Sequence, residues 1–162
     1  MAEVVLALGS NLLDREKNLK TAIEFLSRLP NTTVEGVSSI YATKPFLVPD
    51  EQNDYLNCCA KIKTGLSAET LLGCCLGIES AMGRIRTYKN AARIIDIDLL
   101  LYEGVTINMD HLVLPHPRIK ERAFVMLPLS DLYPTKIAVG FDFTEEFKKV
   151  GTSGVLFYSA NL

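Results

Sequence analysis

Histidine and cysteine are scarce in this sequence, which limits the metal sites that it can build. The 162 residues include two histidines and four cysteines, and the cysteines stand as two adjacent pairs, Cys58-Cys59 and Cys74-Cys75. No C-x-x-C spacing occurs, so a structural zinc site is not expected. Adjacent cysteines on a strand point to opposite faces and cannot easily pair. We therefore predict four reduced thiols in a cytoplasmic protein.

Long apolar runs and a strong net charge are also missing. No apolar stretch approaches the roughly 18 residues that a membrane span needs. The N-terminal residues show neither the basic region nor the cleavage site of a signal peptide. The formal net charge of −2 argues against a general nucleic-acid binder. We expect a cytoplasmic protein with neither a membrane nor a nucleic acid as its partner.

The composition that remains is that of an ordinary globular protein. Hydrophobic residues make up 48% and charged residues 22% of the chain, which excludes a disordered chain, a collagen and a coiled coil. Domains usually have about 100–200 residues. We expect residues 1–162 to form a single domain and to act as a monomer.

The hydrophobic pattern predicts an alternation of strands and helices. Short apolar or alternating runs indicate strands, and apolar residues three or four apart indicate helices. The expected order is a strand at 4–8, a helix at about 14–29, strands at 33–41 and 55–63, a helix at 67–82 and a strand at 94–102. This βαββαβ order is that of the ferredoxin-like arrangement. We predict an α+β fold, with an antiparallel sheet that carries both helices on one face.

The pattern after residue 102 is weaker. It predicts a short strand at 105–107, a loop at 111–117, some helix within 119–129 and a helical turn at 145–149.

The sharpest chemical signal is a pair of carboxylates, Asp96 and Asp98, in the last of these strands. Residues two apart on a strand share a face, with Cα atoms about 6.6 Å apart. Two such carboxylates can bind a hard cation, and Mg²⁺ favours one or two carboxylates together with substrate phosphates. The alternative is a merely solvated acidic face, although acids flanked by so many Ile and Leu residues are costly to bury without a role.

Positive charge gathers on both sides of this pair. The basic residues are Arg84, Arg86, Lys89 and Arg93 before the strand, and Arg118, Lys120 and Arg122 after it. Guanidinium groups bind phosphate oxygens in a bidentate manner, so beside the carboxylates they suggest a polyphosphate site. A solvated loop is the alternative. Glu79, near the end of the second predicted helix, is either an arginine partner or a surface carboxylate without a role.

A third signal comes from Tyr55 and Asn57, which share one face of their predicted strand. An aromatic ring beside a side-chain amide suits a flat heterocycle, which stacks on the ring and hydrogen-bonds at its edge. Phe124 is a candidate for a second ring, and ordinary core packing is the alternative for these aromatic residues. The motif Gly9-Ser10-Asn11-Leu12 is by itself typical of a strand-to-helix turn.

Together, these short motifs resemble the 6-hydroxymethyl-7,8-dihydropterin pyrophosphokinase family of folate biosynthesis. They follow the family's order along roughly the first 130 residues: Gly9-Ser10-Asn11-Leu12, Tyr41-x-Thr43-x-Pro45, Asp54-Tyr55-Leu56-Asn57, Glu79, Gly83-Arg84-x-Arg86, Arg93-x-x-Asp96-x-Asp98, Pro115-His116, Arg122-x-Phe124 and Pro128-Leu129. The sequence departs from the family in two loops, where Leu47-Val48 replaces a segment that often has a glycine and Ala91-Ala92 replaces a Gly-Pro pair.

The resemblance implies an α-β-α layered domain on a ferredoxin-like core, and Mg²⁺-dependent transfer of pyrophosphate from ATP to the pterin hydroxymethyl group with release of AMP. Two Mg²⁺ ions would be held by Asp96 and Asp98. Catalytic roles are implied for Arg84, Arg93 and Asp98. The implied pterin-binding residues are Thr43, Lys44, Phe46, Tyr55, Asn57 and Phe124. The implied ATP-binding residues are Glu79, Arg84, Arg86, Arg93, His116 and Arg122.

Two other classes of function compete with this one. A non-catalytic ferredoxin-like module that binds a small metabolite needs no paired carboxylates on a central strand. A metal-dependent nucleotidyltransferase or phosphohydrolase would use the same aspartate pair, but Tyr55, Asn57 and Phe124 suit a small heterocycle better than a broad substrate.

Overall fold

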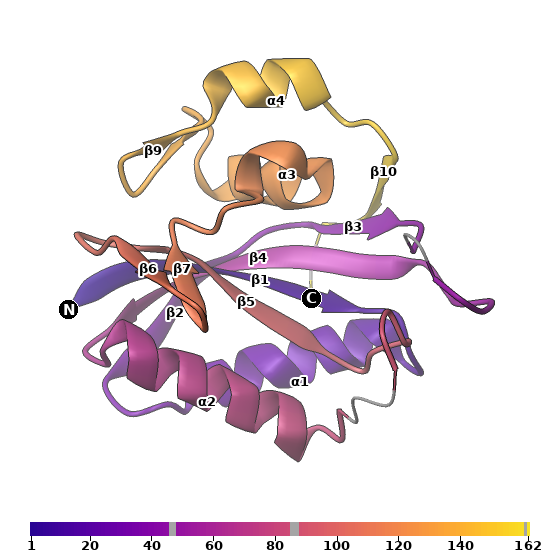
Figure 1. Cartoon of the computed structure of the whole chain (residues 1–162), viewed down its shortest axis with the longest axis horizontal. Coiled ribbons are helices and arrows are strands. Elements are labelled where there is room, and N and C mark those ends of the chain that lie inside the picture. Colours follow the sequence, from indigo (N-terminus) through magenta and orange to yellow (C-terminus); the bar gives the residue numbers. More distant parts are fainter. Residues whose placement is uncertain (46–47, 85–87, 161) are drawn as a thin grey trace.

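The computed structural model describes residues 1–45, 48–84, 88–160 and 162, and a twisted antiparallel sheet lies at its centre (Figure 1). The strands of this sheet are β1 (Ala2–Ser10), β2 (Thr32–Val37), β3 (Ile40–Thr43), β4 (Tyr55–Thr64), β5 (Asp96–Tyr102) and β10 (Val155–Ser159). They are ordered β10-β3-β4-β1-β5, and β2 also pairs with β4. The predicted ferredoxin-like core is confirmed.

Helices cover both faces of the sheet (Figure 1). On one face lie α1 (Arg15–Ser27) and α2 (Ala68–Ala81), and on the other lie α3 (Ala123–Leu132) and α4 (Thr144–Val150). Each interface has its own hydrophobic core. Leu56, Cys58, Ala60 and Ile62 of β4 pack toward α1 and α2, whereas Cys59 belongs to the core beneath α3. The strand alternation therefore produces the expected α-β-α layers.

Local signals in the sequence fix the ends of the two helices of the ferredoxin-like core. Asp14 and Ser67 precede α1 and α2, and their side chains accept hydrogen bonds from the backbone N–H groups of Lys17 and Thr70. These caps satisfy donors that would otherwise have no partner in the first turn. Gly83 follows α2 with a φ of +91°, a conformation that favours glycine. The helix expected at 67–82 is therefore confirmed as α2.

The single strand expected at 33–41 is wrong, because two strands, β2 and β3, occupy this region. Ser38 lies at the break between them. Its hydroxyl accepts a hydrogen bond from the Cys59 N–H at 2.8 Å, and its own N–H donates to the Cys59 carbonyl at 2.9 Å. A short polar residue can bond to neighbouring backbone in this way, so the chain bends without leaving β4.

The region after β5 differs most from the expectation. The loop predicted at 111–117 contains β7 (Leu112–Leu114), which pairs with β6 (Ile107–Met109). A 3₁₀ turn (Ile119–Glu121) precedes α3, and a small hairpin joins β8 (Ile137–Ala138) to β9 (Phe141–Asp142). These strands have two or three residues each, which is too short for an alternating pattern to register. The helices predicted within 119–129 and at 145–149 are present as α3 and α4.

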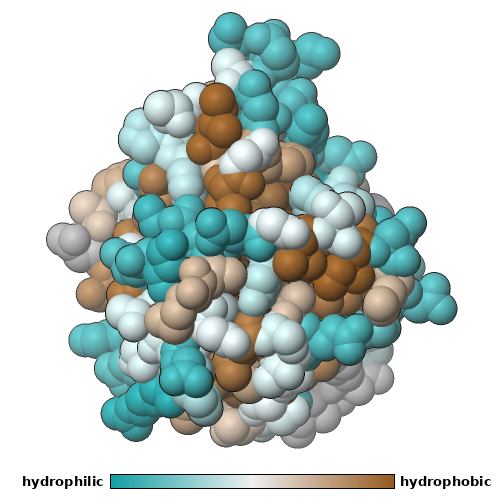
Figure 2. Space-filling view, turned by 90° about the vertical axis from the view of Figure 1, so that its left-hand side faces the viewer, coloured by the Kyte–Doolittle hydropathy of each residue, from teal (hydrophilic) through white to brown (hydrophobic). Residues whose placement is uncertain are grey.

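Among the described residues, none of the helices has both the length and the apolar character needed to cross a membrane. Figure 2 shows the side of the molecule that is on the left in Figure 1, where hydrophobic residues lie in small groups between hydrophilic ones.

Candidate functional site

A cleft of about 700 Å³ lies over β1, β4 and β5, on the face of the sheet that also carries α3. It brings together most of the residues that the sequence singled out for chemistry. The predicted site residues that line it are Thr43, Lys44, Tyr55, Asn57, Arg93, Asp96, Asp98, Arg122 and Phe124. The aspartate pair, two arginines and the aromatic-amide group therefore share one site, although they come from distant parts of the sequence.

The sheet register explains why these residues meet. Gly9 of β1 pairs with Asn57 of β4 on one side and with Asp96 of β5 on the other. Two residues earlier, Ala7 pairs with Asp98. Paired residues point to the same face, so β1 places small residues between the amide and the carboxylates. This arrangement leaves room for a ligand above the middle strand.

Asp96 lies between two arginines. Arg84 Nη1 donates to its Oδ1 at 3.0 Å, and Arg93 Nη1 donates to its Oδ2 at 3.1 Å. Arg84 also forms a very short ion pair with Glu79. Each carboxylate oxygen of Asp96 keeps a second lone pair, so these contacts leave coordination capacity for a cation.

Glu79 is buried beneath this cluster, with 3% of its surface exposed. Besides Arg84, its Oε2 accepts a hydrogen bond from the backbone N–H of Ile97, between the two aspartates, at 2.8 Å. The possibility that Glu79 is a surface carboxylate is therefore wrong, and the arginine partnership is confirmed. Over the described residues, the cleft lining includes neither Glu79 nor Arg84.

Asp98 has an unusual electrostatic environment. Burial, followed by the charge of the nearby Asp96 carboxylate, raises the pKa of Asp98 to about 6, and the positive charge of Arg122 opposes this rise. Burial also lowers the pKa of Arg122, whose guanidinium lies 5.5 Å from the centroid of the Phe124 ring. A carboxyl group that titrates near neutrality in a cleft is a candidate for proton transfer.

His116 lies close to this charge cluster. Burial lowers the pKa of His116, and the charges of Arg122 and Arg118 lower it further. Its Nδ1 accepts a hydrogen bond from the Arg118 N–H at 3.2 Å. The neutral imidazole is therefore favoured. His116 is not part of the cleft lining within the described segments.

The amide of Asn57 is held in a fixed orientation. Its Nδ2 donates to Thr43 Oγ1 at 3.0 Å and contacts the Tyr41 carbonyl at 3.4 Å, and the residue is 7% exposed. Tyr55 and Phe124 are only partly buried and line the same cleft. Complete core packing, the alternative for these two aromatic residues, is not what the structure shows.

Some site residues were missed by the sequence analysis. Gly9, Val48, Asn90 and Glu121 also line the cleft. Gly9 belongs to a motif of the family resemblance, but it is the register of β1 that shows its place in the site. Two predicted residues, Phe46 and Arg86, lie outside the described residues.

A metal ion at this site would rely on the two aspartates. Over the described part of the chain, no group of three or more His, Cys, Asp or Glu side chains is arranged to hold a metal ion. Mg²⁺ does not need such a group, because it commonly uses one or two carboxylates and completes its coordination with phosphates and water. The donor set of Asp96 and Asp98 fits this mode of binding.

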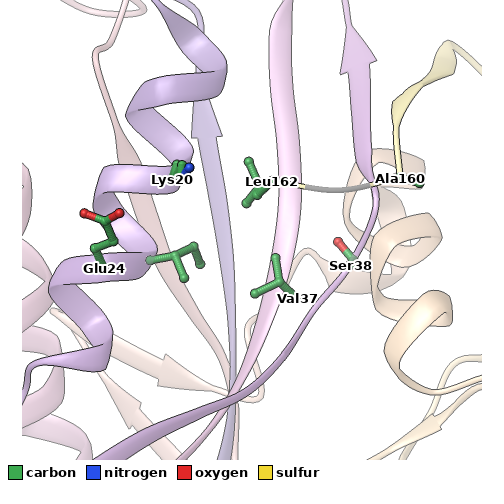
Figure 3. Close-up of a pocket in the computed structure, with 7 residues that line it drawn as sticks. Lys20, Glu24, Val37, Ser38, Ala160 and Leu162 are labelled. Carbon is green, nitrogen blue, oxygen red and sulfur yellow. The ribbon is translucent and has the colours of Figure 1, made fainter.

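A second, smaller hollow of about 370 Å³ lies between α1 and the end of β2 (Figure 3). Its walls carry Lys20 and Glu24 from α1, Val37 at the end of β2, Ser38 just after it, and Leu162. Figure 3 shows the polar ends of Lys20, Glu24 and Ser38 beside the alkyl side chains of Val37 and Leu162. Its described residues include neither the paired carboxylates nor the arginines of the larger cleft, which therefore remains the candidate site.

Comparison with known proteins identifies the family that this chain matches. Residues 5–134 match the family described as 7,8-dihydro-6-hydroxymethylpterin-pyrophosphokinase (HPPK). A 2-amino-4-hydroxy-6-hydroxymethyldihydropteridine pyrophosphokinase of Methylorubrum extorquens is 39% identical over 96% of this chain and 98% of its own length. The Bacillus subtilis protein of the same name is 41% identical over 78% of this chain and 75% of its own.

Other similar proteins are much longer than this chain. The folic acid synthesis protein FOL1 of Dictyostelium discoideum is 40% identical over 83% of this chain, which spans only 20% of that protein. Among solved structures, a Plasmodium falciparum HPPK-DHPS variant matches with a TM-score of 0.70 at 16% identity, covering 94% of this chain and 43% of its own. At that identity the match supports the fold alone.

Proposed function

The chain belongs to the 7,8-dihydro-6-hydroxymethylpterin-pyrophosphokinase family, and we propose that it transfers pyrophosphate from ATP to the hydroxymethyl group of 6-hydroxymethyl-7,8-dihydropterin, with release of AMP. Homologues that match most of their length carry the name of this pyrophosphokinase, a transferase of folate biosynthesis. The observation that carries the proposal is the single cleft in which the aspartate pair, Arg93 and Arg122 face Tyr55, Asn57 and Phe124.

The aromatic-amide side of the cleft is proposed to bind the pterin. Tyr55 and Phe124 offer ring faces on which a flat heterocycle stacks. Asn57 offers an amide whose orientation is set by Thr43, so it reads the edge of the ring system. Lys44 lines the same region, and Phe46, outside the described residues, remains part of this prediction.

The arginine-rich side is proposed to bind the triphosphate. Arg93 and Arg122 line the cleft, and Arg84 is held just behind Asp96. Glu79 holds Arg84 from behind, and His116 and Arg86 complete the predicted ATP-binding set. Guanidinium groups that are fixed in advance stabilise charge that moves between phosphate oxygens in the transition state.

Asp96 and Asp98 are proposed to hold two Mg²⁺ ions, which would supply charge neutralisation for the triphosphate. Asp98 is also the candidate to accept the proton of the attacking hydroxyl group, because it is a cleft carboxylate whose pKa in the metal-free protein is raised to about 6 by burial and by Asp96. The reaction needs no covalent enzyme intermediate. A monomer in the cytoplasm remains part of the proposal, and the four free cysteines support that location.

The proposal is tested by incubating the protein with ATP, Mg²⁺ and the pterin alcohol, and by separating the nucleotide products. AMP is expected only when both substrates and Mg²⁺ are present. Formation of ADP would contradict pyrophosphate transfer, and AMP formed without pterin would favour the phosphohydrolase alternative. Pterin binding without any nucleotide product would favour the non-catalytic module.

The assignment of the pterin side is tested by calorimetry on Asn57→Ala and Phe124→Ala. Both variants are expected to bind pterin at least about tenfold more weakly. Asn57→Ala leaves the heterocycle edge unpaired, which costs roughly 1–3 kcal/mol per group, and Phe124→Ala removes a ring face on which the heterocycle stacks. Their affinity for ATP without pterin should be unchanged. Phe25→Ala, which removes a partly exposed ring on α1, is the matched control. Pterin affinity equal to that of the parent in both site variants would contradict the assignment.

A further inference from the structure

One buried side chain joins the two sides of the cleft from beneath. Asn11, at the turn after β1, is 1% exposed. Its Oδ1 accepts a hydrogen bond from the Arg93 N–H at 2.7 Å, and its own N–H donates to the Arg93 carbonyl at 3.0 Å. Its Nδ2 donates to Gln52 Oε1 at 2.9 Å and contacts the Asn53 carbonyl at 3.4 Å. One amide therefore bonds to two separate loops.

The two loops lead to opposite sides of the proposed site. Gln52 and Asn53 precede β4, which begins at Tyr55 and carries the proposed pterin residues. Arg93 precedes β5 and holds Asp96 through its guanidinium. The loops also contact each other directly, because Gln52 Nε2 donates to the Asn90 carbonyl at 2.9 Å. A displacement of either loop therefore displaces the other through the hydrogen bonds of Asn11 and Gln52.

Only an asparagine meets all these demands at this position. The amide has one acceptor oxygen and two donor hydrogens, and the observed partners use both kinds. A carboxylate oxygen in place of Nδ2 would face the oxygens of Gln52 and Asn53 and would lose both contacts. It would still accept the hydrogen bond from the Arg93 N–H. Within the described residues, neither Asn11 nor Gln52 lines the cleft.

We propose that Asn11 is a positioning residue that couples the pterin subsite to Arg93, so that occupation of one side of the cleft favours binding on the other. This inference rests on the proposed function of the two sides. The coupling acts through the Asn11–Gln52 hydrogen bond and requires no contact between Asn11 and either substrate. By thermodynamic reciprocity, each substrate then raises the affinity for the other by the same factor.

Two variants remove the Asn11–Gln52 hydrogen bond, one by changing its donor and the other by changing its acceptor. Asn11→Asp keeps the contact to Arg93 and loses the contact to the loop before β4. Gln52→Ala removes the same hydrogen bond without adding a charge, and it changes a partly exposed residue. Asn18→Ala is the matched control, because Asn18 Nδ2 donates to Ser10 Oγ at 3.2 Å and to the Leu12 carbonyl at 2.9 Å, within the same turn.

The experiment measures pterin affinity by calorimetry with and without Mg²⁺ and an ATP analogue that has a methylene group between the α and β phosphorus atoms. In the parent protein the analogue is expected to tighten pterin binding at least about fivefold, the low end of usual coupling factors. In Asn11→Asp and Gln52→Ala this factor should fall toward one, while each ligand alone binds within about twofold of the parent. In turnover, the KM of each substrate, measured at saturation of the other, should rise by about the lost coupling factor, whereas a merely structural role would leave both KM values unchanged. Asn18→Ala should lower the melting temperature and keep the coupling.

The outcomes separate this inference from the proposed function. Coupling that survives in both Asn11→Asp and Gln52→Ala overturns the inference, and so does an equal loss in Asn18→Ala or a parent protein without coupling. In each of these cases AMP formation by the parent leaves the proposed function intact. A parent that neither binds pterin nor forms AMP overturns both. If Asn11→Asp does not fold, Gln52→Ala decides the question.

Discussion

Asp98 combines a proposed catalytic role with an energetic cost. Its pKa is raised from 3.8 to about 6, first by burial and then by Asp96. The folded protein therefore holds this proton more tightly than the unfolded chain does. This contribution to stability is present at low pH and is lost as the pH rises from about 4 to about 6.

The first prediction follows from the loss of this stabilising contribution as the pH rises. Without metal, Asp98→Asn is expected to raise the free energy of unfolding at pH 7 by about 1–3 kcal/mol, because the cost of the buried charge is removed. The variant should also lose turnover and show a flatter dependence of stability on pH between 4 and 6. Urea unfolding between pH 4 and pH 7 measures the free energy of unfolding and its dependence on pH, and the AMP assay measures turnover. A variant that is less stable than the parent at pH 7 would show that the carboxylate supports the fold instead.

Gly9 provides the second prediction. A Cβ atom at this position would lie 3.3 Å from Asn57 Oδ1 and 3.5 Å from Tyr55 Cδ1. Gly9→Ala should therefore push the amide away from its pterin-reading position and raise the KM for pterin by roughly tenfold, the equivalent of one poorly paired hydrogen bond. The KM for ATP should change little. Steady-state kinetics with each substrate varied in turn would reveal an equal rise in both KM values, which would contradict the local explanation.

Some residues of the site could be predicted from the sequence because their relation is local. Asp96 and Asp98 are two apart on one strand, and so are Tyr55 and Asn57, so the period of a strand places each pair on one face. The burial of Glu79 could not be predicted, since its partners include a backbone N–H group in β5. Likewise Asn11 stands in a segment typical of an ordinary turn. Its role depends on Gln52 and Arg93, which lie in two loops far from it in the sequence.

At the scale of elements, Glu79 joins the end of α2 to the start of β5. The Glu79 and Arg84 side chains are 5% and 7% exposed, and Oε2 of Glu79 also accepts the Ile97 N–H. Removing one member of a buried pair leaves the other charge uncompensated, which costs more than the pair itself contributes.

The third prediction compares two substitutions at this position. Glu79→Ala is expected to lower the free energy of unfolding by about 3–5 kcal/mol. Glu79→Gln should lose less, because the amide oxygen still accepts the Ile97 hydrogen bond. Glu69→Ala, on an exposed part of the same helix, is the control and should stay within about 0.5 kcal/mol of the parent. Denaturant unfolding measures all three, and equal losses in Glu79→Ala and Glu69→Ala would contradict a buried linkage.

The elements themselves were predicted to different degrees for a physical reason. Strands β1, β4 and β5 have seven to ten residues, long enough for alternation or apolar runs to appear. By contrast, β10 has five residues, with Leu156, Phe157 and Tyr158 all exposed. It belongs to the sheet because β3 pairs with it from more than a hundred residues away. Such long-range pairing overrides what the local sequence favours.

At the scale of the whole molecule, the order of the core elements was enough to predict the ferredoxin-like sheet, because split βαβ connections allow few topologies. The second helical layer was not predicted in detail. It matters for the site, since Phe124 lies in the first turn of α3 and Arg122 precedes the helix, so this layer forms one wall of the cleft. The two layers pack on opposite faces of the same sheet and should therefore unfold as one cooperative unit.

The cysteines test that cooperativity. Cys58, Cys59 and Cys75 are buried, and burial raises the pKa of Cys58 and of Cys75 to about 12. Cys59 faces α3, whereas Cys58 and Cys75 lie in the core beneath α1 and α2. Because the thiolate is the reactive form, these three thiols should react with a disulfide reagent only when the protein opens. The partly exposed Cys74 should react at once.

The fourth prediction is that the two cores open together. In native buffer one thiol should react rapidly, and the other three should react with a single slow rate that rises with urea in parallel with global unfolding. Mass spectrometry of the labelled peptides assigns each thiol. Modification of Cys59 well before Cys58 and Cys75 would instead show that the α3–α4 layer opens alone. Saturating substrate should slow the three buried thiols equally, because a ligand that binds only the folded state stabilises the whole cooperative unit.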